Sequence, residues 1–145
     1  MQNRILVLGY GVQGRKRHAI SKQSVVAIVD PELDRSVVDF ANIYDVPMES
    51  YDSVLMCVPD NQKERLLTYC IENNKHVLVE KPLVVANADY IEELSNLARK
   101  NEVVFYTAYN HRFEPHFVKM KQLLDSGELG KIYSCRMFYG NGTAK

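Results

Sequence analysis

The segment VLVEKPLVV interrupts an apolar run with Glu80, Lys81 and Pro82. Glutamate and lysine are rarely buried without a partner, and proline cannot donate a hydrogen bond to a sheet. Pro82 also disfavours a helical conformation at Lys81. The pattern therefore predicts a buried strand over residues 76–80 whose carboxyl end presents Lys81. In open α/β sheets, ligands bind at that end of the strands.

A lysine in this place has two interpretations. Its ammonium can hydrogen-bond a substrate hydroxyl, stabilise the alkoxide that develops as a hydride leaves, or transfer a proton. Alternatively, Glu80 and Lys81 form a surface ion pair at the strand end, which contributes little to stability. The spacing of the residues alone does not separate the two interpretations.

A second candidate site is the turn GYGVQG, which lies between a predicted strand and a predicted helix. Gly9 allows a tight turn, Gly11 lets the backbone approach a pyrophosphate, and Gly14 permits close packing of helix on strand. The first helical residues, Val12 and Gln13, offer the free N–H groups and positive potential of a helix N-terminus. This context is the one that the dinucleotide-binding fingerprint requires. The alternative is a set of turn glycines with no ligand.

Asp30 ends the second predicted strand, about 20 residues after the glycine turn, where this fingerprint expects an acid. A carboxylate there accepts from both ribose hydroxyls and repels a 2′-phosphate, so Asp30 favours NAD, with NADP possible. The cations from Arg15 to His18 oppose the dipole at the start of the predicted helix. They either serve an anion or are simply solvated.

The chain as a whole alternates between strands and helices. Strands are predicted at residues 4–8, 24–29, 53–58, 76–80 and 103–108, and helices at 12–20, 32–41, 61–74, from a cap at Asn87 to Lys100, and from Pro115 to Gly127. In the third helix, Asn61 and Glu64 are spaced as a capping pair. The alternation implies βαβ units and a mainly parallel sheet of the α/β class.

The tail has a different pattern. Residues 131–140 alternate, with Tyr133, Cys135, Met137 and Tyr139 on one face, which predicts a half-buried strand with no following helix. We expect a domain over residues 1–126 and the start of a second, truncated domain over residues 127–145.

Composition limits the function further. The 145 residues contain 18 basic and 18 acidic side chains, so no basic excess favours nucleic acid or anionic membranes as partners. No apolar run approaches the length of a membrane span, and no signal-peptide pattern precedes the first strand. We interpret the three cysteines as reduced thiols of a cytoplasmic protein, and no Cys/His cluster has metal-site spacing, so no metal is expected.

The segments GYGVQG, CVPDNQ, NKHVLVEKPL and YNHRFEP, in this order with Asp30, resemble the glucose–fructose oxidoreductase/inositol dehydrogenase (Gfo/Idh/MocA) family. The resemblance implies a Rossmann-type, doubly wound parallel sheet followed by a second α/β domain. It also implies an NAD(P)-dependent dehydrogenase of sugars, sugar nucleotides or cyclitols that forms a homo-oligomer.

The resemblance also assigns roles to particular residues. Lys81 matches the active-site lysine of the family, and Pro82 helps to shape the crevice. The other residues that it places near the cofactor are Pro59, Asn61, Glu80, Asn110 and Arg112.

Three departures from the family pattern stand out. Val58 replaces a threonine before Pro59, and Lys63 replaces a frequent histidine four positions after that proline. The second catalytic group of the family, commonly a histidine, lies in the C-terminal domain and has no counterpart here. We therefore expect a hydride-transferring oxidoreductase whose 145-residue chain alone is catalytically incomplete. The alternatives are a non-catalytic dinucleotide- or sugar-binding regulator of the same fold and a fragment with a structural use only.

Overall fold

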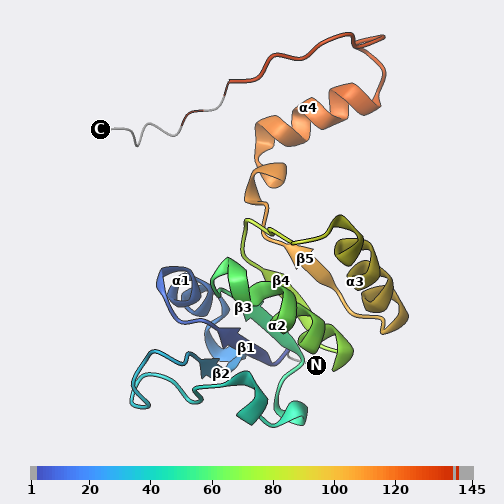
Figure 1. Cartoon of the computed structure of the whole chain (residues 1–145). Helices are drawn as coiled ribbons and strands as arrows, with labels where there is room; N and C mark the ends of the chain where they lie inside the picture. Colours follow the sequence, from blue (N-terminus) through green and yellow to red (C-terminus); the bar gives the residue numbers. More distant parts are fainter. Residues whose placement is uncertain (1–2, 139, 141–145) are drawn as a thin grey trace. The chain divides into compact units, whose positions relative to one another are not determined.

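The computed structural model describes residues 3–138 and 140. They belong to two compact units, which divide the chain into residues 1–109 and 110–145 (Figure 1).

The first unit is built on a parallel sheet of five strands in the order β2-β1-β3-β4-β5. The strands are β1 (Ile5–Leu8), β2 (Val25–Val29), β3 (Ser53–Met56), β4 (His76–Val79) and β5 (Phe105–Thr107). All five predicted strands are confirmed, and each is slightly shorter than predicted. Because every pair is parallel, the five carboxyl ends lie along one edge, and the chain order reverses between β1 and β3.

Helices cover both faces of this sheet. Leu6 and Leu8 of β1 belong to the core cluster shared with α2 (Asp60–Glu72) and α3 (Ala88–Lys100). Val7 points to the other face, where α1 (Val12–Ser21) lies, and a Cβ built on Gly14 of α1 would lie 3.5 Å from its Cγ1. The predicted Rossmann-type, doubly wound arrangement is confirmed.

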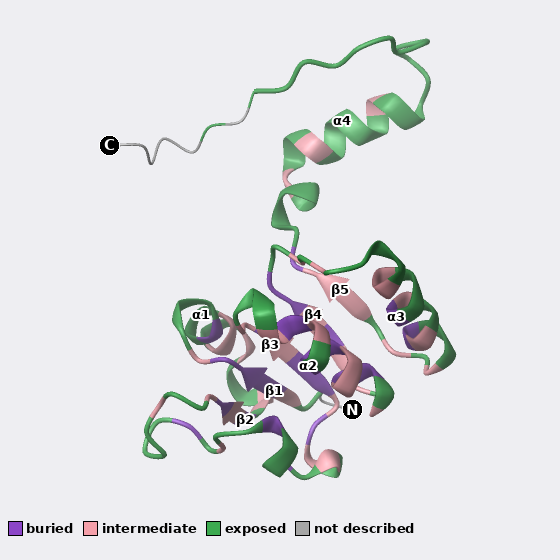
Figure 2. Cartoon of the chain, viewed as in Figure 1, coloured by how far each residue is buried: buried purple, intermediate pink, exposed green. Residues whose placement is uncertain are grey.

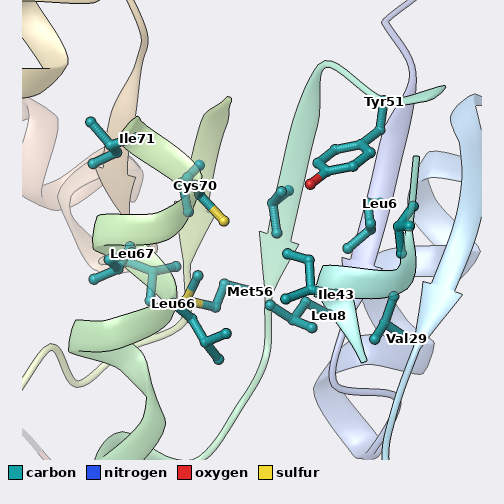
Figure 3. Packing of buried hydrophobic residues seen from close by; sticks show 14 of the residues in the cluster. Leu6, Leu8, Val29, Ile43, Tyr51, Met56, Leu66, Leu67, Cys70 and Ile71 are labelled. Carbon is teal, nitrogen blue, oxygen red and sulfur yellow. The ribbon is translucent and has the colours of Figure 1, made fainter. Parts of the chain in front are cut away.

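The core lies on the face of the sheet that is covered by α2, by α3 and by the segment between β2 and β3 (Figures 2 and 3). Four residues of α2 form the buried stripe that the sequence predicts: Leu66, Leu67, Cys70 and Ile71. They belong to the same buried cluster as Met56 of β3 and as Tyr51, which is fully buried just before β3. Truncating one of these large side chains to alanine would cost about 2–5 kcal/mol.

The predicted helix over residues 32–41 is wrong. Residues 34–38 make a single turn, in which Asp34 Oδ1 accepts from the N–H of Ser36. Phe40 then forms a parallel bridge with Val29, and Asp39 Oδ2 accepts from the N–H of Ile28. Aspartate and serine side chains compete with helical hydrogen bonds, and the edge of β2 binds the rest of the segment. The short 3-10 turns η1 (Lys22–Ser24), η2 (Ile43–Asp45) and η3 (Met48–Ser50) complete the connections around β2.

The predicted capping pair of α2 is also wrong. The helix begins at Asp60, Pro59 occupies the N-cap position, and Glu64 accepts instead from the N–H of Ala86 at 2.6 Å. In α3, by contrast, the predicted cap is confirmed because the Asn87 side chain accepts from the N–H of Asp89.

The second unit contains η4 (Asn110–Phe113) and α4 (Pro115–Asp125). Pro115 starts α4 as predicted, and Gly127 follows it at φ +74°. The predicted strand over residues 131–140 is wrong, because residues 131–138 have no regular secondary structure and Tyr133 is 83% exposed. A strand needs a neighbour for its backbone groups, and the described residues of this unit contain none. Tyr139 and residues 141–145 lie outside the described residues.

Within the described parts of the chain, no helix is both long and apolar enough to cross a membrane.

Candidate functional site

A cleft of about 830 Å³ lies in the first unit, beyond the carboxyl ends of β1, β2 and β3. This is the switch point of the sheet, where open α/β folds bind their ligands. The cleft is lined by the glycine turn, the end of β2 and the start of α2, namely Gly9, Tyr10, Gly11, Val12, Arg15, Asp30, Pro31, Glu32, Leu33, Cys57, Val58, Pro59 and Gln62. Five predicted site residues therefore lie together: Gly9, Gly11, Val12, Asp30 and Pro59.

The three glycines of the turn differ in their surroundings. A Cβ on Gly9, whose φ is +87°, would lie 2.6 Å from the carbonyl oxygen of Cys57. A Cβ on Gly14 would lie 2.0 Å from the carbonyl oxygen of Gly9. At Gly11 a Cβ would meet nothing within 4 Å. Gly9 and Gly14 are thus required by packing, whereas Gly11 leaves open space over the start of α1.

Asp30 is fixed against the glycine turn. Its Oδ2 accepts from the N–H of Tyr10 at 2.7 Å, and its Oδ1 accepts from the N–H of Glu32 at 2.9 Å. Each carboxylate oxygen has two acceptor positions, so both oxygens can still accept from a ligand. The sequence predicted the acid but not Tyr10, whose backbone N–H orients it.

The basic residues of α1, from Arg15 to His18, contact different partners. The Arg15 guanidinium lies 4.7 Å over the ring of Tyr10 and lines the cleft. The Tyr10 hydroxyl and Nδ1 of His18 share a hydrogen bond of 2.7 Å. Arg17 Nε donates to Oε1 of Glu80 at 2.6 Å, while Lys16 is exposed. Arg15 is therefore the member of the cluster that faces the cleft.

Glu80 is a buried acid, and the surface ion pair with Lys81 does not form. Its relative exposure is 8%, and its carboxylate pairs with Arg17. Lys81 is exposed at the bend after β4, and its peptide bond to Pro82 is cis. A catalytic role for Lys81 remains a prediction.

The contacts of Lys63 were not predicted from the sequence. It is 1% exposed, and its Nζ donates to the carbonyl oxygens of Glu80 at 2.8 Å and Pro82 at 2.5 Å. The signal was its position, because Lys63 falls on the same helical stripe as Leu67 and Cys70 of α2. A lysine on an apolar stripe requires buried acceptors.

Cys57 reaches the cleft from the end of β3. Burial, followed by the nearby Glu80 carboxylate, raises the pKa of its thiol to about 11. The thiol is therefore neutral at physiological pH and is a poor nucleophile.

The remaining predicted residues lie elsewhere. Gln13 is exposed in the first turn of α1, and Asn61 is exposed in α2 beside a separate hollow next to Val84 and Val85. Asn110 and Arg112 belong to η4 of the second unit, so their part in the site remains a prediction. Among the described side chains, no group of three His, Cys, Asp or Glu residues could hold a metal ion.

Comparison with known proteins gives relatives for most of the chain. Inositol 2-dehydrogenase 1 of Saccharopolyspora erythraea is 32% identical over 146 aligned positions, which cover 90% of this chain and 43% of the relative. Myo-inositol 2-dehydrogenase of Thermotoga maritima is 34% identical over 86 positions, covering 59% of this chain and 25% of that protein. The chain thus spans less than half the length of these curated relatives.

Solved structures share the fold. A probable dehydrogenase from Thermotoga maritima matches with a TM-score of 0.71 and 27% identity, over 88% of this chain and 42% of that one. The WlbA dehydrogenase of Bordetella pertussis, solved with NADH and UDP-GlcNAcA, matches with a TM-score of 0.75 and 16% identity, over 92% of this chain and 45% of that one.

The model of the Gfo/Idh/MocA family, described as an oxidoreductase family with an NAD-binding Rossmann fold, matches residues 3–109. These residues include the whole sheet, the glycine turn, Asp30 and Lys81. The chain belongs to this oxidoreductase family.

Proposed function

We propose that this chain is the NAD(H)-binding part of a dehydrogenase that transfers hydride between nicotinamide and a hydroxyl carbon of a cyclitol, sugar or sugar nucleotide. The observation that carries the proposal is the Asp30 carboxylate, held by the N–H of Tyr10 at 2.7 Å beside the open space over Gly11. The names of the relatives, which include inositol 2-dehydrogenases, support the cyclitol class of substrate.

The residues of the cleft fit a dinucleotide. Gly11 has no side chain and no neighbour in the way, so a pyrophosphate can approach the N–H groups of Val12 and Gln13 at the start of α1. Asp30 has acceptor positions for the hydroxyls of the adenosine ribose. Its negative charge repels a 2′-phosphate, which supports NAD over NADP. When bound, nicotinamide supplies the hydride acceptor or donor.

Lys81 has a distinct part in the proposed reaction. Exposed at the carboxyl end of β4, its ammonium can donate to the substrate oxygen and stabilise the negative charge that develops there as the hydroxyl proton leaves. Glu80 lies directly before Lys81 in the chain, and its ion pair with Arg17 anchors this end of β4 to α1. We expect a second catalytic group to come from a part of the dehydrogenase that corresponds to none of the residues of this chain.

The test is an NMR titration of the ¹⁵N-labelled chain with NADH. We expect the amide signals of residues 9–14 and of Asp30 to shift most, with micromolar to millimolar affinity. Adding myo-inositol and NAD⁺ should give no sustained turnover by this chain alone. Shifts confined to other regions would contradict the proposed NAD(H) site. Sustained turnover by this chain that is lost in Lys81→Ala would support the role of Lys81 but contradict the expectation that a second catalytic group is needed.

A further inference from the structure

One buried ammonium holds the backbone on both sides of Lys81. Nζ of Lys63 donates to the carbonyl oxygen of Glu80 at 2.8 Å and to that of Pro82 at 2.5 Å. These two carbonyl groups belong to the residues immediately before and after Lys81.

The third donor of the ammonium is also used. Nζ of Lys63 lies 2.6 Å from Oδ1 of Asp60, one turn earlier in α2. A lysine ammonium has three N–H donors, and here each of them has an acceptor. Because burying a charged group without partners is costly, the ammonium favours the one backbone arrangement that supplies these acceptors.

The sheet itself secures only one side of Lys81. The N–H of Glu80 donates to the carbonyl oxygen of Met56 at 2.9 Å, which extends the pairing of β4 with β3. Pro82 has no N–H and cannot continue this pairing. Lys63 therefore adds, through the Pro82 carbonyl, an attachment that the strand cannot make.

We infer that Lys63 is a positioning residue, which fixes the backbone of Lys81 so that its exposed ammonium projects from a defined point at the carboxyl edge of the sheet. The catalytic meaning of this position rests on the function proposed above for Lys81. The attachment of the backbone on both sides of Lys81 rests on the contacts of Lys63 alone.

The chain provides a matched control. Lys75 Nζ also donates to two backbone carbonyl groups, those of Met48 at 2.6 Å and Tyr51 at 2.8 Å. Lys75→Met therefore removes the same chemistry from a different loop of the same unit.

The experiment measures backbone order at Lys81 by ¹⁵N relaxation in the wild-type chain, Lys63→Met and Lys75→Met. We expect the order parameter of the Lys81 amide to fall from about 0.85 to below about 0.6 in Lys63→Met. In Lys75→Met it should keep its wild-type value, while order near Met48 and Tyr51 decreases. An unchanged value at Lys81 in Lys63→Met, or an equal fall in both variants, would overturn the inference.

A milder variant covers the case in which Lys63→Met does not fold. The Lys63→Gln side chain keeps N–H donors but is one bond shorter, so it reaches one of the two carbonyl groups and should give an intermediate order parameter at Lys81. A value equal to wild type would overturn the inference. NADH titration of the wild-type chain tests the proposed function separately, because absent binding would refute that function while leaving the loss of order at Lys81 intact.

Discussion

Arg17 Nε lies 2.6 Å from Oε1 of Glu80, and this pair joins the helix of the glycine turn to the strand that presents Lys81. The side chains are 22% and 11% exposed, so the pair is largely shielded from water. Leaving one charge of a shielded pair without its partner costs far more free energy of folding than leaving an exposed charge unpaired at the surface.

Removing one partner of this pair should destabilise the protein strongly. We expect Glu80→Gln to lower the free energy of unfolding by about 3 kcal/mol, because it leaves the Arg17 guanidinium without its counter-charge. Urea unfolding followed by circular dichroism gives this value. The control is Lys121→Ala, which breaks an exposed pair with Asp125 and should cost at most about 0.5 kcal/mol. Equal losses in the two variants would show that the pair of Arg17 and Glu80 is solvated.

Substitutions at two glycines of the turn should affect stability and cofactor binding separately. Gly9→Ala places a Cβ 2.6 Å from a backbone oxygen at positive φ, so we expect a loss of about 3 kcal/mol in unfolding free energy. Gly11→Ala meets no neighbour and should change stability by less than about 1 kcal/mol, yet weaken NADH at least about tenfold by blocking the approach to α1. Thermal melts and NADH titration measure both effects. Undiminished NADH affinity in Gly11→Ala would place the pyrophosphate elsewhere.

The parts of the fold that depend on local chemistry were predictable. The turn from Gly9 to Gly14 needs glycine for reasons that operate within a few residues, and Asn87 caps α3 through its own side chain. Residues 32–41 show where prediction from the local sequence fails. Their apolar pattern is typical of a helix, but Phe40 pairs with Val29 at the edge of β2. That pairing partner is set by the tertiary structure and not by the local sequence.

The residues of the candidate site also divide into those that the sequence could predict and those that depend on the tertiary structure. Asp30 could be found because its distance from the glycine turn is characteristic of the fold. The acceptors of Lys63 could not be found, since Glu80 and Pro82 are distant in sequence and offer backbone carbonyl groups, which every residue has. The partner of Glu80 was equally hidden among the four basic residues from Arg15 to His18 in α1.

Cys57 should react slowly and should be protected by the cofactor. Its pKa of about 11, against 9.0 for an unperturbed thiol, lowers its thiolate fraction by about a hundredfold at pH 8, so Cys57 should react more slowly with a maleimide than an unperturbed thiol. Mass spectrometry of partly labelled protein gives the rate at each cysteine, with the exposed Cys135 as the internal reference. NADH should slow Cys57 further because this residue lines the cleft. Reaction of Cys57 as fast as Cys135, or a rate indifferent to NADH, would be inconsistent with this account.

Asp52 should make stability depend on acid pH. The hydrogen bonds from Arg4 lower the pKa of its carboxyl to about 2, below the value of 3.8 for an unperturbed aspartate. A folded-state pKa below the unfolded one stabilises the protein fully above about pH 4, and this contribution is lost as the pH falls towards 2. Urea midpoints between pH 5 and pH 2 should therefore fall less steeply in Asp52→Asn and in Arg4→Met than in wild type. Parallel curves for all three proteins would show that the pair does not persist in solution.

The central claim is that the cleft beside Asp30 binds NAD(H), and calorimetric titration with NADH and NADPH tests it most directly. We predict tighter binding of NADH than of NADPH by the wild-type chain. Asp30→Ala should weaken NADH about tenfold or more through the loss of charge-assisted hydrogen bonds, and should narrow the gap to NADPH. Glu32→Ala, which removes a second acid from the same cleft, should leave the preference for NADH in place. Equal or tighter binding of NADPH by the wild-type chain would contradict the claim for Asp30 and direct attention to Arg15, and no binding of either dinucleotide would contradict the account as a whole.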